Sequence, residues 1–388
     1  MLWHSAEISS TSILVIGARN SGKTSFLNFL RTSLALPPRK QRHTPANDDL
    51  DPDFSPPSSG GSNNFTSHYI ETEIDGERIG LTLWDSQGLE KGVVDLQLRE
   101  MSSFLESKFE DTFAEEMKVV RAPGTRDTHI HCVFLVLDPV RLDANVAAAH
   151  AISNGTTIGG YTGDKSPRVV GGLGEDLDLQ VLRTLQGMTT VVPVISKADT
   201  ITTAHMAFLK KTVSDSLKKA NLDPLEALGL DDFEGENSTD HFDERDEDAE
   251  LAKKTARTHQ DDLSSSPNTS DSETNSPPKP KRPAAHARTP SSLSQTSPTS
   301  PETPYLPLSI ISPDVYDTTP GPGGKVGRKF PWGFADPYNL EHCDFLRLKE
   351  AVFTEWRGEL REASRELWYE GWRTTRLNTS AGRNRGRR

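Results

Sequence analysis

Two glycines, a lysine and a threonine near the start of the chain have the spacing of a loop that binds phosphate. Gly17, Gly22, Lys23 and Thr24 satisfy the pattern G-x-x-x-x-G-K-[S/T]. The glycines allow a tight turn that points successive backbone N–H groups inward, so that they form a concave anion site. The lysine then reaches the β- and γ-phosphates, and the threonine hydroxyl is placed to bind Mg²⁺.

The residues on either side of this loop predict the elements that it requires. Residues 13–16 are apolar and predict a buried strand, and residues 25–30 repeat apolar positions at helical spacing. A helix that opens at Lys23 would point its positive dipole end at the phosphates. This context favours a nucleotide site over the alternative, a simple glycine-containing turn between a strand and a helix.

A second motif follows the next two predicted strands. Residues 69–74 and 79–84 are joined by Asp75-Gly76, which predicts a β-hairpin that ends at Asp85. Asp85 and Gly88 then form D-x-x-G. The aspartate would hold Mg²⁺ through water, and the glycine would offer its N–H to a γ-phosphate. D-x-x-G alone is a common turn, but its place on the strand after a phosphate loop favours the nucleotide interpretation.

A third motif, Ser196-Lys-Ala-Asp199, comes directly after the apolar run 189–195, which predicts a buried strand. Guanine presents N1–H and an amino group side by side, and one carboxylate accepts both, whereas adenine offers no such pair. Asp199 is therefore predicted to select GTP over ATP, and the aliphatic part of Lys197 would lie over the purine.

Composition limits the function classes. The chain has 388 residues, a formal net charge of −12 and two cysteines. The negative charge argues against nucleic acid as a partner, and two cysteines do not make a disulfide framework or a zinc site. Because the sequence has neither a signal segment nor an apolar run of about 18 residues, we expect a cytoplasmic protein.

We expect one long α/β domain that is interrupted by polar insertions. Low apolar content and dense Pro, Ser or Asp predict that these insertions are mostly disordered, and weak periodicity predicts an irregular one after residue 139. The expected parts are a short N-terminal segment at 1–11, the domain at 12–376 with insertions near 37–65, 140–172 and 231–304, and a basic, unstructured tail at 377–388. Within the domain, we expect helices at 94–113, 176–185, 203–220 and 345–376, and strands at 129–138 and 305–311.

The C-terminal part of the domain resembles the septins, a family of cytoskeletal GTP-binding proteins. The residues that carry the resemblance are Gly327-Arg-Lys-Phe-Pro-Trp-Gly333, Asn339-Leu-Glu-His-Cys-Asp-Phe-Leu-Arg-Leu348 and Trp368-Tyr-Glu-Gly-Trp-Arg373. They look like the septin-unique element. The resemblance implies a three-layer P-loop GTPase domain that carries this element.

The resemblance also implies roles for individual residues, with GTP or GDP and Mg²⁺ as cofactors. Asp85 and Gly88 would lie at the γ-phosphate, Lys197 and Asp199 would hold the guanine, and Arg328 would lie beside the base. Thr24 and Asp85 would hold the Mg²⁺ ion. The phosphate-binding residues would be Gly17, Asn20, Ser21, Gly22, Lys23, Thr24 and Ser25.

Several positions depart from the septin pattern. The family's Asp-Thr-Pro-Gly is Asp85-Ser-Gln-Gly88 here, and the glutamate after Lys-Ala-Asp is replaced at or near His205. The position of the catalytic threonine that orients water falls beside an insertion. Thr66 is the candidate for this position, and Asn64 is the alternative. Leu89 takes the place of the water-orienting glutamine of Ras-type enzymes.

The leading hypothesis is therefore a GTP-binding, septin-like protein that assembles with other septin subunits into hetero-oligomers or filaments and hydrolyses GTP slowly or not at all. The alternatives are a GTP-binding scaffold or GTPase that does not polymerise, and an ATP-using P-loop enzyme, which Asp199 disfavours. The resemblance implies a place in the cytoskeleton, at the cell cortex or at a septum or bud neck, with the basic tail as a candidate for membrane contact. The aromatic cluster at 330–334 would lie at a subunit contact, although Trp332 alone could equally be core.

Overall fold

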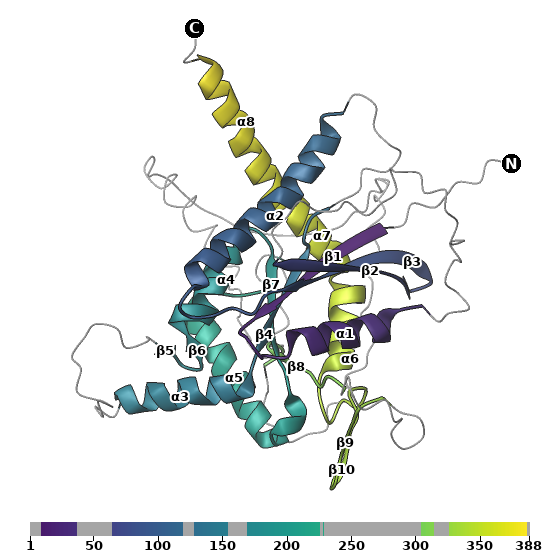
Figure 1. The fold of residues 1–388 in the computed structure, drawn as a ribbon, viewed down its shortest axis with the longest axis vertical. Coiled ribbons are helices and arrows are strands. Elements are labelled where there is room, and N and C mark those ends of the chain that lie inside the picture. The colour runs from purple at the N-terminus through teal and green to yellow at the C-terminus, as the bar shows by residue number, and fades with distance from the viewer. Residues whose placement is uncertain are drawn as a thin grey trace, which may run out of the picture. The chain divides into compact units, whose positions relative to one another are not determined.

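A six-stranded sheet of order β2-β3-β1-β4-β7-β8 brings the three predicted motifs to one edge (Figure 1). Only β2 is antiparallel to its neighbour; the other adjacent strands pair in parallel. The carboxyl ends of β1, β3, β4 and β7 therefore lie along the same edge, where α/β sheets bind their ligands. The strands are β1 (Ser9–Gly17), β2 (Phe65–Ile74), β3 (Glu77–Ser86), β4 (Cys132–Leu137), β7 (Thr190–Ile195) and β8 (Leu308–Ser309).

The computed structural model describes part of the chain, namely residues 9–36, 64–118, 128–153, 169–225, 228, 304–313 and 326–385. These residues belong to one compact unit, made of Met1–Glu234 and Glu302–Arg388. The predicted insertions near 37–65 and 231–304 fall almost wholly outside the described residues; the exceptions are residues 64–65, where β2 begins, and residue 304.

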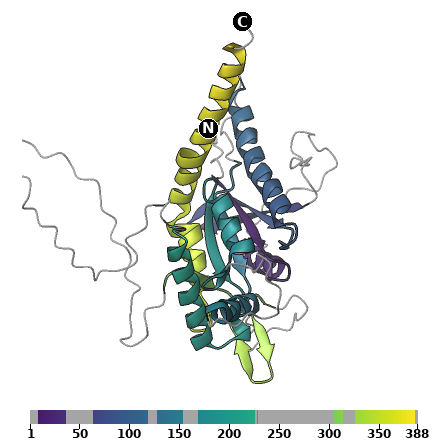
Figure 2. The ribbon, with the colours of Figure 1, turned by 90° about the vertical axis from the view of Figure 1, so that its left-hand side faces the viewer.

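Helices lie on both faces of the sheet, as the edge view shows (Figure 2). The arrangement confirms the predicted three-layer α/β fold of the P-loop GTPase type. The α-helices are α1 (Lys23–Leu34), α2 (Val94–Glu116), α3 (Pro139–Ser153), α4 (Gln180–Leu185), α5 (Thr203–Lys219), α6 (Phe345–Glu350), α7 (Arg357–Ala363) and α8 (Glu370–Arg385).

The centre of the sheet is fully buried. Every residue of β4 and of β7 is buried, as expected for parallel strands that are covered on both faces. The hairpin of β2 and β3 is confirmed too. Asp75 and Gly76 have φ values of 51° and 78°, the positive values that a two-residue type I′ turn requires.

The prediction of an irregular insertion at 140–172 was wrong for its first part. Helix α3 occupies Pro139–Ser153, and the short antiparallel pair β5 (Val169–Val170) and β6 (Leu173–Gly174) follows the gap in the described residues. The periodicity is weak here because alanines fill the sequence after Asn145. Alanine has the highest intrinsic helix propensity, so helix formation needs no strong apolar stripe.

The C-terminal region also differs from the prediction. The expected strand at 305–311 is reduced to β8, and the expected unstructured tail is helical as far as Arg385. Arginine is a good helix former, and α8 is held to α2 where Arg376 donates to Glu110 over 2.7 Å. The helical stretch before α8 is interrupted by π-helical turns at Ala351–Glu355 and Ser364–Tyr369.

The remaining elements are short. A π-helical turn at Glu175–Leu179 leads into α4, and a 3₁₀ turn at Ala198–Thr200 follows β7. A hairpin of β9 (Arg328–Phe330) and β10 (Gly333–Ala335) lies outside the main sheet. Within the described ranges, no helix is both long and apolar enough to span a membrane.

Candidate nucleotide-binding site

The loop between β1 and α1 has the backbone of an anion site. Gly17 and Gly22 have φ values of 153° and 92°, and Asn20 adopts a left-handed conformation with φ of 62°. A Cβ on Gly17 would lie 2.4 Å from the carbonyl oxygen of Val136 on β4, so only glycine fits here. The loop is therefore pressed against the sheet, and the first turn of α1 opens directly after it.

Lys23 is a buried cation at this loop. The residue is 7% exposed, and its Nζ donates to the carbonyl oxygen of Ala18 over 2.9 Å. Burial lowers the pKa of Lys23, and the nearby charge of Asp85 opposes this effect. Because Lys23 makes no ion pair among the described residues, a bound phosphate would supply its missing counter-ion.

Thr24 and Asp85 come together as a metal would require. The Thr24 hydroxyl donates to Oδ2 of Asp85 over 2.9 Å, which joins the start of α1 to the end of β3. The other carboxylate oxygen, Oδ1, is buried and has no hydrogen-bond partner in the described part of the chain. Oxygen ligands of this kind suit Mg²⁺. Thr24 and Asp85 would hold the ion, which would neutralise charge on the phosphates.

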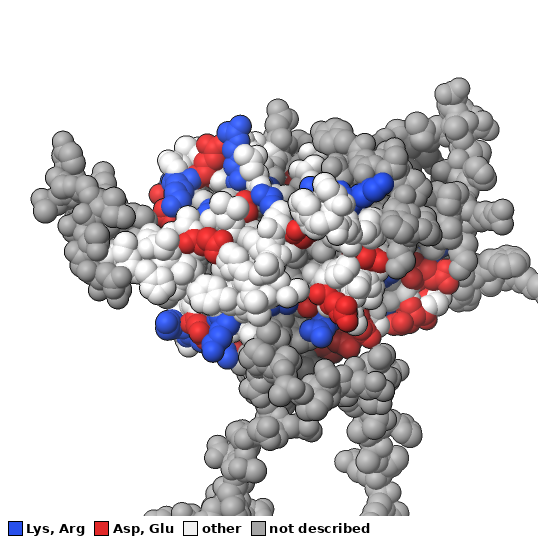
Figure 3. Space-filling view, turned by 90° about the horizontal axis from the view of Figure 1, so that it is seen from below, with Lys and Arg blue, Asp and Glu red and all other residues white. Residues whose placement is uncertain are grey.

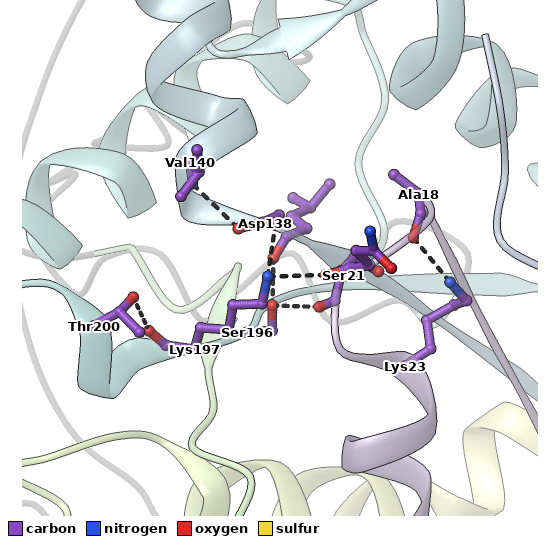
Figure 4. Close-up of polar contacts among 10 residues, drawn as sticks. Ala18, Ser21, Lys23, Asp138, Val140, Ser196, Lys197 and Thr200 are labelled. Atoms are coloured by element: carbon purple, nitrogen blue, oxygen red, sulfur yellow. Dashed lines mark hydrogen bonds and ion pairs between the residues drawn. The ribbon is translucent and has the colours of Figure 1, made fainter.

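The loop after β7 is tied to the phosphate loop by two side chains (Figure 4). Ser196 Oγ donates to the carbonyl oxygen of Ser21 over 2.6 Å, and Lys197 Nζ donates to that of Asn20 over 2.8 Å. Lys197 also pairs with Asp138, at the end of β4, over 2.8 Å. These contacts fix the distance between the loop after β7 and the phosphate loop.

Asp199 has one carboxylate oxygen engaged and one available. Its side chain has no exposed surface, and Oδ2 accepts from Nη1 of Arg328 over 2.7 Å. Oδ1 is buried without a partner among the described residues. A buried acceptor that lacks a donor is costly, and the paired donors of guanine would satisfy it. Oδ2 can accept a second bond beside that of Arg328, because a carboxylate has about four lone-pair sites.

The segment after Asp85 is held against the phosphate loop. Leu89 N donates to Gly17 O over 3.0 Å, and Arg19 N donates to Leu89 O over 3.1 Å. The side chain of Gln97 accepts from Glu90 N at 2.9 Å and donates to the carbonyl oxygen of Gly88 at 3.1 Å. Leu89 itself is 2% exposed. The chain at the expected γ-phosphate end is therefore fixed by hydrogen bonds from two directions.

The structure brings most of the predicted site residues to the same edge of the sheet. Ser25 lies in the first turn of α1, and Ser21 is fully buried with no partner for its hydroxyl among the described residues. Thr66 is exposed on β2, opposite Asp85 in the strand register. The side-chain amide of Asn64, the alternative candidate, donates to Glu100 of α2 over 2.6 Å. The catalytic role of Thr66 stays a prediction.

Sequence reasoning missed several residues that hold the site together. It gave no role to Asp138, Ser196, Arg19 or Ile310, although the first two come directly after buried strands. Parallel strands that end at one edge were the available signal for them. No local pattern indicated Ile310. Its carbonyl oxygen accepts from Ala198 N over 3.0 Å, although the two residues are 112 positions apart in the sequence.

Together the sheet order, the phosphate loop and the carboxylate at the end of β7 define the class of protein, a P-loop GTPase-type α/β domain. Comparison with known proteins shows which family the chain resembles. The sequence profile described as Septin matches residues 170–255 and 294–385. Over these residues the chain is similar to septins.

The relatives are distant. Cell division control protein 11 of Saccharomyces cerevisiae is 21% identical over 370 residues, which cover 95% of this chain and 66% of that protein. Septation protein 7 of Candida albicans is 21% identical over 405 residues, which cover 96% and 48%. The crystal structure of the septin GTPase domain from Chlamydomonas reinhardtii has a TM-score of 0.48 and 16% identity, and covers 94% of this chain and 98% of that one. The chain spans less than two thirds of the length of these two curated relatives.

The packing of Gly88 against the phosphate loop predicts the effect of one methyl group. A Cβ on Gly88 would lie 2.8 Å from the backbone Cα of Arg19. We expect Gly88→Ala to push the segment off the loop and to lower the free energy of unfolding by about 1–3 kcal/mol. Amide hydrogen exchange at Leu89 should become faster, because its bond to Gly17 is lost. Gly187→Ala is the matched control, since a Cβ there meets nothing within 4 Å. A Leu89 amide that stays as protected in Gly88→Ala as in the wild type would contradict this account.

Proposed function

We propose that this protein binds GTP or GDP with Mg²⁺ and uses the nucleotide mainly to support assembly with other septin subunits. The observation that carries the proposal is the buried carboxylate of Asp199. One oxygen is held by Arg328, and the other lacks a donor among the described residues. Phosphate at Lys23 and the metal at Thr24 and Asp85 would complete the ligand at the opposite end of the site.

The likeness to septins supports the cytoskeletal part of the proposal. Two of the relatives have names that refer to cell division control and septation. By analogy we propose a place at a septum or bud neck, in hetero-oligomers or filaments. Membrane contact through the basic C-terminal residues is a further element of the proposal, and α8 would carry those residues as far as Arg385.

The β9–β10 hairpin is the proposed subunit contact. Trp332 is 84% exposed and stacks on Phe330 with ring centroids 5.3 Å apart, so it is not a core residue. Arg328 of the same hairpin reaches Asp199, which places the exposed aromatic pair close to the base-binding loop. Seen from the hairpin side of the molecule, a broad uncharged area lies between charged residues (Figure 3). An exposed tryptophan suits burial against a partner.

Guanine selectivity is the first prediction from this proposal. Asp199→Ala removes the acceptor of two charge-assisted hydrogen bonds, so GTP affinity should fall by about 2–3 kcal/mol. Competition binding against ATP measures the selectivity. Glu341→Ala, which removes an exposed carboxylate from a position just after the β9–β10 hairpin, is the control and should leave GTP affinity unchanged. Displacement of GTP by ATP at equal concentrations on the wild type would rule out the guanine site.

Slow hydrolysis is the second prediction. Leu89 stands where Ras-type enzymes carry glutamine, and its backbone and side chain are both occupied by the phosphate loop and the core. Single-turnover measurements should therefore give a rate far below that of a fully activated GTPase. Thr66→Ala should lower any residual rate, whereas Asn64→Ala should not, because the Asn64 side chain is bonded to α2. A single-turnover hydrolysis rate comparable with that of an activated GTPase would contradict this prediction.

Assembly through the hairpin is the third prediction. The full chain, co-expressed with septins of the same cell, should form complexes whose mass drops when Trp332→Ala removes the exposed indole. Loss of such a residue at an interface centre typically costs about 2 kcal/mol or more. Tyr69→Ala removes another exposed aromatic, 59% exposed on β2, and should leave the complexes intact. A wild type that binds GTP yet stays monomeric with every partner would show that polymer formation has been lost.

A further inference from the structure

A backbone hydrogen bond links the guanine-reading turn to β8, which lies far away in the sequence. The turn Ala198–Thr200 carries Asp199, and Ala198 N donates to the carbonyl oxygen of Ile310 over 3.0 Å. Ile310 N in turn donates to Ile195 O over 2.9 Å. Ile310 is fully buried and directly follows β8. The position of Asp199 therefore depends on where β8 lies against β7.

Asp344 holds β8 in that place. Its Oδ2 accepts from Ser309 N at 2.8 Å and from Ser309 Oγ at 2.5 Å, while Asp344 N donates back to Ser309 O at 2.8 Å. Lys210 of α5 pairs with the same carboxylate oxygen. Asp344, Ser309 and Lys210 are 5%, 3% and 8% exposed. A two-residue strand is thus fixed by three hydrogen bonds to one residue and by a buried cation behind it.

The carboxylate is kept ionised in this buried place. Burial by itself would raise the pKa of Asp344, but the charge of Lys210 and the hydrogen bonds from Lys210 and Ser309 outweigh it, so that the pKa lies below its usual value. Arg347 adds a weaker, half-exposed contact to the other oxygen at 3.5 Å. A buried ion pair is poor evidence for stability alone, because desolvation offsets much of its attraction. Its best-attested use is to fix one arrangement of the elements that carry it.

We propose that Asp344 is a positioning residue for base recognition. It holds β8 against β7 and thereby places the Ala198–Thr200 turn so that the carboxylate of Asp199 can bind guanine. The inference rests on the proposed function of Asp199. The C-terminal region would then position the carboxylate of Asp199 in two ways: directly through Arg328, and indirectly through the backbone contacts that Asp344 makes with β8. At the phosphate end, the side chains of Lys23 and Thr24 bond to Ala18 and Asp85, and within the described ranges neither bonds to Asp344, Ser309 or Ile310.

The test compares base selectivity with phosphate binding in the full chain. Two charge-assisted bonds from guanine predict that the wild type prefers GDP over ADP by about a hundredfold or more. Asp344→Asn should lower this preference by about tenfold, because the carboxylate of Asp199 is no longer held at the base. ADP affinity, which does not use Asp199, should stay within about twofold. Competition titration with GDP and ADP in the presence of Mg²⁺ gives both values.

Two further variants keep the test decisive. Ser309→Ala keeps the ion pair and removes one hydrogen bond, so it should fold and shift selectivity in the same direction by a smaller factor. Leu105→Ala opens a cavity in α2, away from β8, and should lower thermal stability without changing the preference. If Asp344→Asn does not fold, the preference of Ser309→Ala for GDP over ADP decides whether the inference holds.

Three outcomes would overturn the inference. The first is wild-type selectivity in folded Asp344→Asn or, if that variant does not fold, in Ser309→Ala. The second is an equal loss of GDP and ADP affinity, which would show general damage rather than positioning. The third is a wild type without a preference for GDP, which would overturn the proposed function of Asp199 together with this inference.

Discussion

The hydrogen bond from Lys197 to the carbonyl oxygen of Asn20 joins the two halves of the candidate site. Together with the bond from Ser196 to Ser21, it fixes the loop after β7 to the loop after β1. The strand between them, β4, contributes Asp138 to the same cluster. A nucleotide has a fixed distance between its phosphates and its base, so both loops must be held at a matching separation. The register of three parallel strands sets that separation here.

The base end depends on residues that come late in the chain. Asp199 is buried, and a buried carboxylate needs a cation or several donors to remain charged. Arg328 supplies the cation and is itself one third exposed, with 33% of its side-chain surface accessible. Ile310 supplies the acceptor that fixes the backbone of the turn. In the proposed site, base recognition would be complete only when the C-terminal part of the domain has folded onto β7, and this would couple that part of the chain to nucleotide binding.

The phosphate end is built differently, from local sequence. Residues 17–24 are contiguous in the sequence, and Asp85 and the segment at Gly88 join them at the metal and γ-phosphate end. That segment is bonded to the loop by backbone groups, through Leu89 and Arg19. A switch segment that must move with the γ-phosphate is usually among the less stable parts of a domain. The tight packing at Gly88 and Leu89 instead favours a site that binds nucleotide and changes little with its phosphate content.

This difference explains what could be predicted from the sequence. The backbone of the phosphate loop, the Asp75-Gly76 hairpin, the buried strands and the place of Asp199 after β7 were predictable, because each depends on residue types within a short window. The resemblance to septins supplied the assignment of Arg328, which no spacing indicates. Asp138 could have been found from its place directly after a buried parallel strand. Ile310 and Asp344 were not predictable as site-supporting residues, because their roles depend on contacts across 35 to 134 positions in the sequence. Helix α3 was missed because helix propensity, rather than periodicity, determines it.

The central claim is that the edge of this sheet is a guanine-nucleotide site. Mass spectrometry of the nucleotide released from the purified, denatured protein tests it most directly. The account predicts GDP or GTP in an amount approaching one molecule per chain. Recovery of an adenine nucleotide, or of none after the folded protein has been incubated with GTP and Mg²⁺, would contradict it.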